Sequence, residues 1–173
     1  MDKILITGCR GLALALSKEF SKDEVTLVSK STGFDICNVT NWGYSFLNVD
    51  TVINCAYDKD GQLNVLSYFY NHWKDDKSKT IVNIGSKVIN QPRIERSLDH
   101  EFWEYRFHKQ ALQQMHDSML PNAKCNLQIF NFGALDTDMI AGLDIVKMDP
   151  CIAAQKAYKF INDPTIKRVD LWL

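Results

Sequence analysis

Tyr105 and Lys109 stand four residues apart in a stretch that reads Tyr-Arg-Phe-His-Lys. On a helix, residues at positions i and i+4 lie on one face, so the phenol and the ammonium group would be neighbours. A nearby positive charge favours the phenolate, which would lower the tyrosine pKa from about 10 toward neutrality. A tyrosine tuned in this way can pass a proton to or from a carbonyl or alcohol oxygen. The pair therefore predicts acid–base chemistry, although the same spacing also occurs on solvated helices that have no such role.

A serine and an asparagine end two apolar segments that precede this pair. Residues 80–86 are typical of a strand that finishes at Gly85-Ser86, and residues 50–56 of a strand that finishes at Asn54-Cys55-Ala56. Parallel sheets bind ligands outside the carboxyl ends of their strands, so we expect the Ser86 hydroxyl and the Asn54 amide to share one crevice. The alternative for Ser86 is a plain turn serine, which the presence of Tyr105 and Lys109 disfavours.

The N-terminal segment predicts the first unit of a dinucleotide-binding fold. Residues 4–6 form a short apolar run, residues 12–20 have the pattern of a helix, and Thr7-Gly8-Cys9-Arg10-Gly11 lies between them. Glycines let the backbone approach a pyrophosphate, and the helix N-terminus supplies N–H groups and the positive end of a dipole. An ordinary strand–helix turn that happens to hold two glycines would have the same pattern. The prediction of a dinucleotide site therefore depends also on the motifs that follow.

The end of the second predicted strand bears on the choice of dinucleotide. Residues 25–28 lead into Ser29-Lys30-Ser31, with no acidic residue at the strand end. Sites for NAD usually carry an Asp or Glu there, whereas a 2′-phosphate prefers hydroxyl groups and cations. Ser29, Lys30 and Arg10 therefore favour NADP(H) over NAD(H), unless Lys30 is simply a solvated loop lysine.

The rest of the chain continues to alternate strands with helices. We expect a short segment at 34–38, helices over 41–48, 62–73, 100–119 and about 150–161, and further strands at 127–131 and 169–173. Such alternation predicts an α/β fold, a Rossmann-type doubly wound parallel sheet in a three-layer α/β/α arrangement. At 173 residues, we expect a single dinucleotide-binding domain over 1–173.

Composition argues against several classes of function. The 20 basic and 21 acidic residues nearly balance, so neither nucleic acid nor a membrane is expected as a partner. The sequence shows no apolar run of the roughly 18 residues that span a bilayer, and no signal-peptide pattern. The five cysteines lack CxxC spacing and the four histidines lack ligand spacing, which predicts reduced thiols, a cytoplasmic protein and no metal site.

Taken together, these motifs resemble those of the short-chain dehydrogenase/reductase family across most of the chain. Residues 7–13 resemble its glycine motif, Asn54-Cys55-Ala56 its Asn-x-Ala motif, and Ile84-Gly85-Ser86 the strand with its catalytic serine. Tyr105 and Lys109 match its Tyr-x-x-x-Lys pair, and residues 132–139 are similar to its loop beside the nicotinamide.

The resemblance implies roles for these residues. Tyr105 would be the general acid in carbonyl reduction and the general base in alcohol oxidation. Ser86 would hold the substrate oxygen, and Lys109 would bind the nicotinamide ribose and lower the Tyr105 pKa. Asn64 would be the proton-relay asparagine. The expected cofactor-binding residues are Thr7, Gly8, Cys9, Arg10, Gly11, Leu12, Ser29, Lys30, Asp35, Ile36, Asn54, Cys55, Ala56, Tyr105, Lys109, Gly133, Leu135 and Thr137.

The chain also departs from the family pattern. Ala13 stands where a third glycine is usual, and Phe132 replaces a proline. The chain is short, and its region between Asn54 and Ser86 looks compressed, which predicts a shortened or missing strand–helix piece. The segment between residues 137 and 150 is too short for a large substrate lid, so we expect a pocket that is open or completed by a second subunit.

The predicted function is hydride transfer between NADP(H) and a small carbonyl or alcohol substrate. The loops at 87–104 and 138–149 hold Ile, Met, Leu and Trp, which favours a small or apolar carbonyl compound. The alternative is a non-catalytic NADP(H)-binding regulatory or interaction module, which the short chain motivates and the intact Ser86, Tyr105 and Lys109 set opposes. Epimerase or dehydratase chemistry is a third, weaker hypothesis. The related enzymes that use the Tyr-Lys pair for it normally carry a large C-terminal domain, for which this chain has no room.

A homodimer or homotetramer is the expected assembly. In the family, the helix with the Tyr-Lys pair and the helix before it often form a four-helix interface. Aromatic residues are favoured at interfaces, and these two helices carry more of them than one apolar stripe requires. The same side chains could instead fill the core; they are Tyr68, Phe69, Trp73, Phe102, Trp103 and Phe107.

Overall fold

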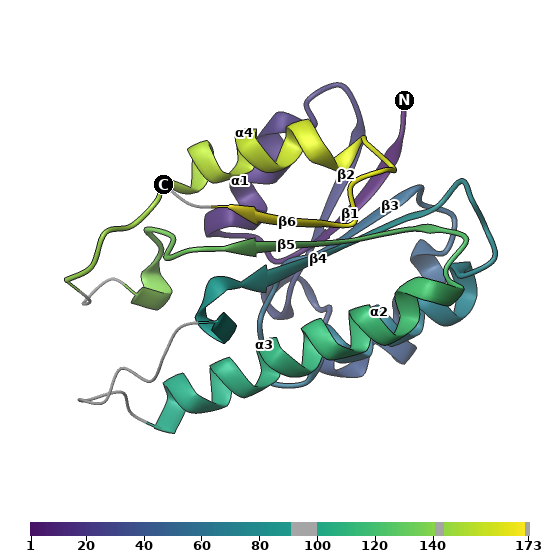
Figure 1. Ribbon diagram of the computed structural model, residues 1–173. Helices are drawn as coiled ribbons and strands as arrows, with labels where there is room; N and C mark the ends of the chain where they lie inside the picture. The colour runs from purple at the N-terminus through teal and green to yellow at the C-terminus, as the bar shows by residue number, and fades with distance from the viewer. Residues whose placement is uncertain (91–99, 141–143, 172–173) are drawn as a thin grey trace.

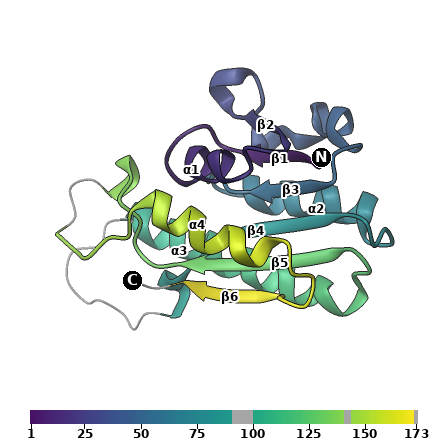
Figure 2. The same ribbon diagram turned by 90° about the horizontal axis from the view of Figure 1, so that it is seen from above.

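One parallel sheet forms the centre of the molecule. The computed structural model describes residues 1–90, 100–140 and 144–171. In this part of the chain, six parallel strands pair in the order β2-β1-β3-β4-β5-β6, which Figure 2 shows from above. They are β1 (Lys3–Thr7), β2 (Glu24–Val28), β3 (Thr51–Asn54), β4 (Thr80–Ser86), β5 (Asn126–Phe132) and β6 (Arg168–Leu171). The predicted doubly wound α/β fold is confirmed.

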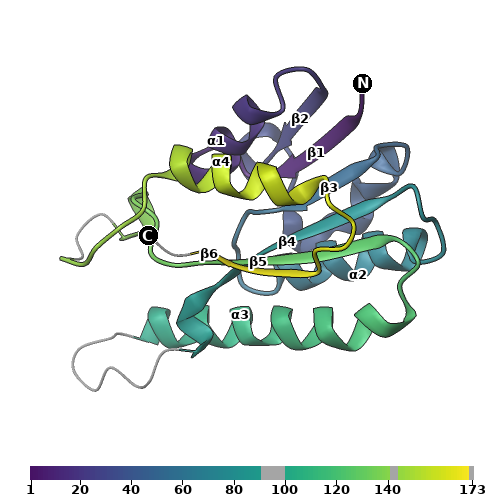
Figure 3. The same ribbon diagram turned by 45° about the horizontal axis from the view of Figure 1, so that its top comes forward.

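Helices cover both faces of the sheet. Figures 1 and 3 show α1 (Gly11–Glu19) and α4 (Pro150–Ile161) on one face, with α2 (Gly61–Trp73) and α3 (His100–Met119) on the other. Side chains alternate between the two faces of a strand, so Ile6 packs in the α1/α4 core and its neighbour Leu5 in the α2/α3 core. Leu5 and Ile6 are both fully buried, as expected for a parallel strand covered on both faces.

The strand order reverses next to β1. This strand is hydrogen-bonded to β2 on one side and to β3 on the other, so the chain leaves β1 toward one edge of the sheet and later returns toward the other. In doubly wound sheets, the crevice outside the carboxyl ends of the strands at such a point is the usual ligand site. The glycine turn after β1 and the Asn-x-Ala segment after β3 lie at this edge.

The helix predicted over 41–48 is wrong. Two short 3₁₀ helices, η2 (Ile36–Asn41) and η3 (Gly43–Phe46), lie there instead. Glycine and aromatic residues are weak helix formers, and this stretch holds Gly43 with three aromatic residues. Trp42 lies between the two turns and donates its indole N–H to the backbone oxygen of Asp35 at 2.8 Å. This tertiary contact, which helix propensity does not describe, organises the segment.

The connection from β3 to β4 differs from the prediction. Between Asn54 and Ser86, α2 makes a complete connection from β3 to β4, so the expected missing piece there is wrong. The stretch that holds 3₁₀ helices and no strand is residues 29–50, between β2 and β3.

Some predicted segments fall partly outside the described residues. The predicted loop 87–99 begins with a 3₁₀ helix, η4 (Lys87–Asn90), and its remainder at 91–99 lies outside them. So do residues 141–143 of the second substrate loop and the last two residues of the strand predicted at 169–173. Among the described helices, none combines the length and the apolarity that crossing a bilayer requires.

A histidine on α3 is buried against the sheet. His116 is only 1% exposed, and its Nδ1 lies 3.5 Å from the Asn83 side-chain nitrogen on β4. Burial lowers the pKa of His116 to about 4; Asp117 opposes this shift, while Arg168 and Lys167 add to it. The imidazole is therefore neutral in the folded protein at neutral pH.

We expect a His116→Gln variant to be less sensitive to acid than the wild type. Unfolded His116 binds a proton near pH 6.5 and folded His116 only near pH 4, so the unfolded state gains protons first and stability falls as the pH falls through this window. Between pH 7 and pH 5 this single group should cost the wild type about 2 kcal/mol of unfolding free energy. Urea denaturation at the two pH values measures the loss. An equal loss in the variant would assign the acid sensitivity to other groups.

Candidate active site

The predicted catalytic residues meet at the carboxyl edge of β4. Ser86 is the last residue of this strand, and its side chain is hydrogen-bonded to that of Tyr105 on α3. The Ser86 oxygen also lies 3.3 Å from the backbone nitrogen of Val88, which fixes the start of η4. Two hydroxyl groups from different elements are thus held together at the edge where sheets of this kind usually bind ligands.

Lys109 lies beneath this pair, buried between α3, α2 and β4. It is 3% exposed, and its Nζ donates hydrogen bonds to Gln62 Oε1 at 2.7 Å and to the Ile84 backbone oxygen at 2.8 Å. The same nitrogen lies 5.4 Å from the centroid of the Tyr105 ring. Burial lowers the pKa of Lys109 to about 8, and the nearby Cys55 thiol opposes the shift.

The pKa of Tyr105 moves in the direction opposite to the prediction. Burial is the largest influence and raises it above its usual value near 10; the Ser86 hydrogen bond lowers it and Cys55 raises it. Two of the three N–H groups of Lys109 are bonded to α2 and β4, and Lys109 is not among the influences on the Tyr105 pKa. The prediction that Lys109 brings the phenol toward neutral pH is wrong in this structure.

Gln62 is one of the residues at the site that the sequence did not reveal. It is 3% exposed, and besides accepting the Lys109 hydrogen bond it donates through Nε2 to the backbone oxygens of Asn54 at 2.8 Å and Ile84 at 3.2 Å. One glutamine in the first turn of α2 thereby joins the ends of β3 and β4 to the lysine on α3.

Asn64, to which the resemblance gave the relay role, lies elsewhere. Its amide donates to the Cys37 backbone oxygen at 3.1 Å, so it binds η2. Gln62 stands two residues earlier, on the helix face that also carries Leu66 and Phe69, both fully buried. A polar residue on an apolar helical stripe was the signal that could have identified it.

A second tyrosine borders the pair. The Tyr57 ring packs edge-on against Tyr105 with centroids 4.8 Å apart, and its hydroxyl lies 3.1 Å from Nδ1 of His108. Nε2 of His108 lies 3.4 Å from a carboxylate oxygen of Asp60. Burial above all raises the pKa of Tyr57 to about 12, so it is a neutral phenol. The sequence gave no motif for Tyr57 or His108. Tyr57, on the loop after β3, and His108, on α3, lie beside Tyr105.

The turn after β1 has a backbone conformation that favours its two glycines. Gly8 and Gly11 have φ values of 103° and 51°, in the left-handed region that favours glycine. A Cβ on Gly8 would lie 3.0 Å from the Ala13 Cβ, and one on Gly11 would lie 3.1 Å from Cγ2 of Thr137. Thr137, predicted on the nicotinamide side, thus reaches the glycine turn from the loop after β5.

The first turn of α1 presents unused backbone N–H groups. Arg10, its exposed N-cap residue, makes no side-chain capping bond, and the first turn holds no acidic residue. An uncapped helix N-terminus beside a glycine turn suits an anion, because the free N–H groups and the helix dipole point toward it. This end of the molecule therefore fits the pyrophosphate of a nicotinamide dinucleotide.

Hydroxyl groups gather at the end of β2. The Oγ atoms of Ser29 and Ser31 lie 2.8 Å apart, and the Cys9 sulfur lies 3.7 Å from Ser31 Oγ. Hydrogen bonds from these serines lower the pKa of the Cys9 thiol. Lys30 turns away from this cluster and forms an ion pair with Asp58, on the loop after β3.

Several predicted cofactor residues bond to the protein itself. Thr7 is fully buried, and its hydroxyl accepts the backbone N–H groups of Cys55 at 2.9 Å and Ala56 at 3.0 Å. Asn54 is also fully buried and donates to Asn83 Oδ1 at 3.0 Å. Its amide nitrogen is therefore bonded within the protein, and the crevice that it was expected to share with Ser86 stays a prediction.

The remaining predicted cofactor residues are spread along the same edge. Leu12 and Ile36 are buried in the α1/α4 and α2/α3 cores, respectively. Asp35 caps η2 by accepting the Cys37 backbone N–H. Gly133 donates its backbone N–H to Leu171 at 3.1 Å, and Leu135 packs against the α1/α4 core.

Solved structures match the chain over nearly its whole length. A short-chain dehydrogenase from Burkholderia cenocepacia, in complex with NADP, has a TM-score of 0.77 at 16% identity, covering 99% of this chain and 88% of that one. A short-chain dehydrogenase/reductase from Vibrio parahaemolyticus has a TM-score of 0.74 at 17% identity, covering 97% and 98%. The fold is that of the short-chain dehydrogenases.

An alcohol dehydrogenase from the archaeon Thermococcus sibiricus, complexed with 5-hydroxy-NADP, has a TM-score of 0.73 at 14% identity and covers 100% of this chain and 96% of that one. No protein-family profile and no curated protein sequence matches the chain. The short-chain dehydrogenase fold is thus established by structure, and the case for an activity rests on the residues at the site.

We expect Gln62→Leu to destabilise the protein by about 2–4 kcal/mol, because leucine leaves the buried Lys109 ammonium short of an acceptor and the Asn54 carbonyl short of a donor. Urea denaturation measures the loss. Lys109→Met removes the buried charge itself, so Gln62→Leu should cost less in that background, and a double-mutant cycle gives the coupling. Equal costs in the two backgrounds would show that Gln62 acts independently of Lys109.

Proposed function

We propose that this protein is a short-chain dehydrogenase/reductase that transfers a hydride between NADP(H) and a small carbonyl or alcohol substrate. The observation that carries the proposal is the hydrogen-bonded pair of Ser86 and Tyr105, with Lys109 buried beside the Tyr105 ring. The pair lies at the carboxyl edge of a doubly wound sheet, where such folds bind ligands. Likeness to structures in complex with NADP supports the same conclusion.

Ser86 and Tyr105 have the chemistry to bind one substrate oxygen. Ser86 donates to the oxygen and orients the carbonyl, and Tyr105 gives it a proton as the carbonyl is reduced. Burial raises the Tyr105 pKa and keeps the phenol protonated, which suits a general acid and favours the direction of reduction at neutral pH. The dinucleotide, when bound, supplies the hydride.

Lys109 positions the cofactor and stabilises the phenolate that remains after proton transfer. With a pKa of about 8, it is mainly charged at neutral pH. Its bonds to Gln62 and to the Ile84 carbonyl hold the ammonium in place and leave one N–H group for a ribose hydroxyl. The charge acts in a buried place, where screening by water is weak.

The glycine turn at 8–11 and the first turn of α1 hold the pyrophosphate in this proposal. Arg10 and the hydroxyls at the end of β2 are the groups that favour a 2′-phosphate. Ile145 and Val146, in the second predicted substrate loop, expose apolar side chains, which is consistent with a small or apolar carbonyl compound.

The alternative of a non-catalytic NADP(H)-binding module has one observation in its favour. Lys109 is bonded to Gln62 and Ile84, and the Tyr105 pKa is raised, so the pair is not poised as a phenolate. Such a module would bind the dinucleotide and would reduce no carbonyl compound.

Association of two or four chains stays a prediction. Phe69 and Trp73 pack in the α2/α3 core, so their large apolar side chains do not require an interface with a second chain. Trp103 and Phe107 are 40% and 65% exposed on α3, so a proposed interface rests on this helix.

We expect Tyr105→Phe to lower carbonyl reduction by about 100-fold or more while sparing NADPH binding, because it removes the proton donor and keeps the ring. Turnover is followed by nicotinamide absorbance on a panel of small aldehydes and ketones, and binding by nicotinamide fluorescence. Tyr44→Phe, at an exposed tyrosine on η3, is the matched control and should change neither.

Retained turnover in Tyr105→Phe would remove this residue from the acid role. NADPH binding without turnover of any compound by the wild type would favour the non-catalytic module. Absence of binding to either dinucleotide would overturn the proposed function.

A further inference from the structure

Lys30, the cation expected to favour a 2′-phosphate, is already bound to an acid. Its Nζ is hydrogen-bonded to Oδ2 of Asp58 and lies 3.7 Å from Oδ2 of Asp35. Asp58 is the main cause of a raised pKa at Lys30, so the ammonium stays charged. Lys30 follows β2 and Asp58 follows β3, and these strands flank β1 on its two sides. The ion pair therefore crosses the carboxyl edge of the sheet at its switch point.

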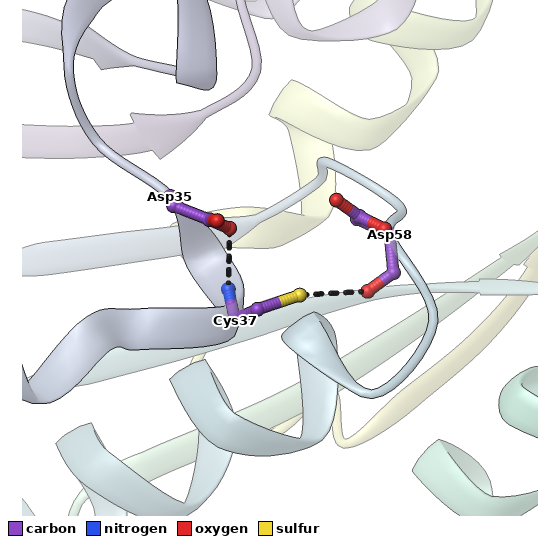
Figure 4. A group of neighbouring side chains, drawn as sticks. All are labelled: Asp35, Cys37 and Asp58. Carbon is purple, nitrogen blue, oxygen red and sulfur yellow. Dashed lines mark hydrogen bonds between the residues drawn. The ribbon is translucent and has the colours of Figure 1, made fainter.

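The fold holds Asp58 in this position. Its backbone oxygen accepts a hydrogen bond from the Cys37 thiol, with a 3.4 Å separation (Figure 4). The same oxygen accepts the Gly61 N–H at 2.8 Å. The next residue, Lys59, adopts a φ of 45°, uncommon for a residue other than glycine, and this tight turn is part of the loop geometry. Burial, with the charges of Asp58 and Asp35, raises the pKa of Cys37 and keeps its thiol a donor.

Asp35 and Asp58 have different tasks, although ligand atoms of both, with the Cys37 sulfur, lie within 4.8 Å of one another. Asp35 accepts the Cys37 backbone N–H at 2.9 Å and the Asn38 side-chain amide at 3.4 Å, so it caps η2 (Figure 4). Within the described residues, the Asp58 carboxylate has Lys30 as its hydrogen-bond donor. Asp58 is therefore the counter-ion of Lys30, whereas Asp35 mainly accepts the backbone N–H that it caps.

We propose that Asp58 is a specificity-determining residue that weakens the preference for NADP(H) by competing with the 2′-phosphate for Lys30. The inference rests on the proposed function, because it concerns the dinucleotide of the same site. To bind Lys30, a 2′-phosphate has to replace the Asp58 carboxylate and bear its repulsion. A 2′-hydroxyl leaves the ion pair intact and can donate to a carboxylate. Arg10 and the serine hydroxyls thus favour NADP(H), and Asp58 opposes them.

The test is isothermal titration calorimetry of the whole chain with NADPH and NADH. Asp58→Asn keeps the shape and removes the charge, so the ratio of NADH to NADPH dissociation constants should rise by about threefold to tenfold. Adenosine 2′,5′-bisphosphate and AMP, which differ in the 2′-phosphate, should show the same change. Raising the salt to about 1 M, where the Debye length is about 3 Å, should shrink it.

Two variants separate this competition from a general effect of charge. Asp60→Asn removes the same charge from an acid two residues away that lies 3.4 Å from His108 Nε2, and it should leave the ratio unchanged. In a Lys30→Met background, Asp58→Asn should have little effect on the ratio. Asp58→Ser repeats the test if the asparagine variant fails to fold.

The outcomes distinguish the inference from the proposal beneath it. An unchanged ratio in Asp58→Asn, with both dinucleotides bound, would overturn the role of Asp58 and leave the proposed function intact. The role of Asp58 would also be overturned if Asp60→Asn raised the ratio of dissociation constants equally, or if Asp58→Asn still raised it in the Lys30→Met background. If neither dinucleotide binds to the wild type or to Asp58→Asn, both the inference and the proposed function fail.

Discussion

A buried ammonium group needs acceptors, and this requirement organises the site. Lys109 finds them in Gln62 on α2 and in the Ile84 carbonyl on β4. An unpaired charge in this place would cost several kcal/mol, so the bonds fix α3 against its neighbours. Gln62 also bonds the Asn54 carbonyl, which brings the end of β3 into the same unit. Tyr105 is held at the edge of the sheet because the lysine one helical turn later is anchored.

Polar side chains also join the strand ends to one another. Thr7 binds the backbone after β3, Asn54 binds Asn83 on β4, and Asn83 approaches His116 on α3. Such buried networks rigidify a structure when their members are paired, and an edge held in this way is preorganised for a ligand. The pairing is incomplete, since Asn54 Oδ1 has no hydrogen-bond partner among the described residues. Thr7 and the amide nitrogen of Asn54 thus bond to the protein itself and hold the strand ends together.

The fold could be predicted where local pattern decides it. The helix expected at about 150–161 matches α4, because Asp149 caps it and Pro150 begins it. The strand expected at 80–86 matches β4, in which Ile81, Val82 and Ile84 are buried. The helix expected over 41–48 failed because the indole bond of Trp42 is a tertiary contact. Propensity and periodicity describe a segment, and this segment takes its conformation from what it packs against.

The site was harder to predict, because its cations find partners far away in the sequence. Lys30 and Asp58 are 28 residues apart, and Lys109 and Gln62 are 47 apart. A motif assigns each cation to a ligand or to a catalytic tyrosine, whereas the folded chain first gives each an internal acceptor. Ligand affinity is then a difference between two sets of bonds, those with the ligand and those with the protein. For Lys109 the internal bonds orient a charge that keeps a free N–H group; for Lys30 they occupy the ammonium that a 2′-phosphate would need. The same physical device, a lysine paired within the protein, therefore supports the site at one end and restrains it at the other.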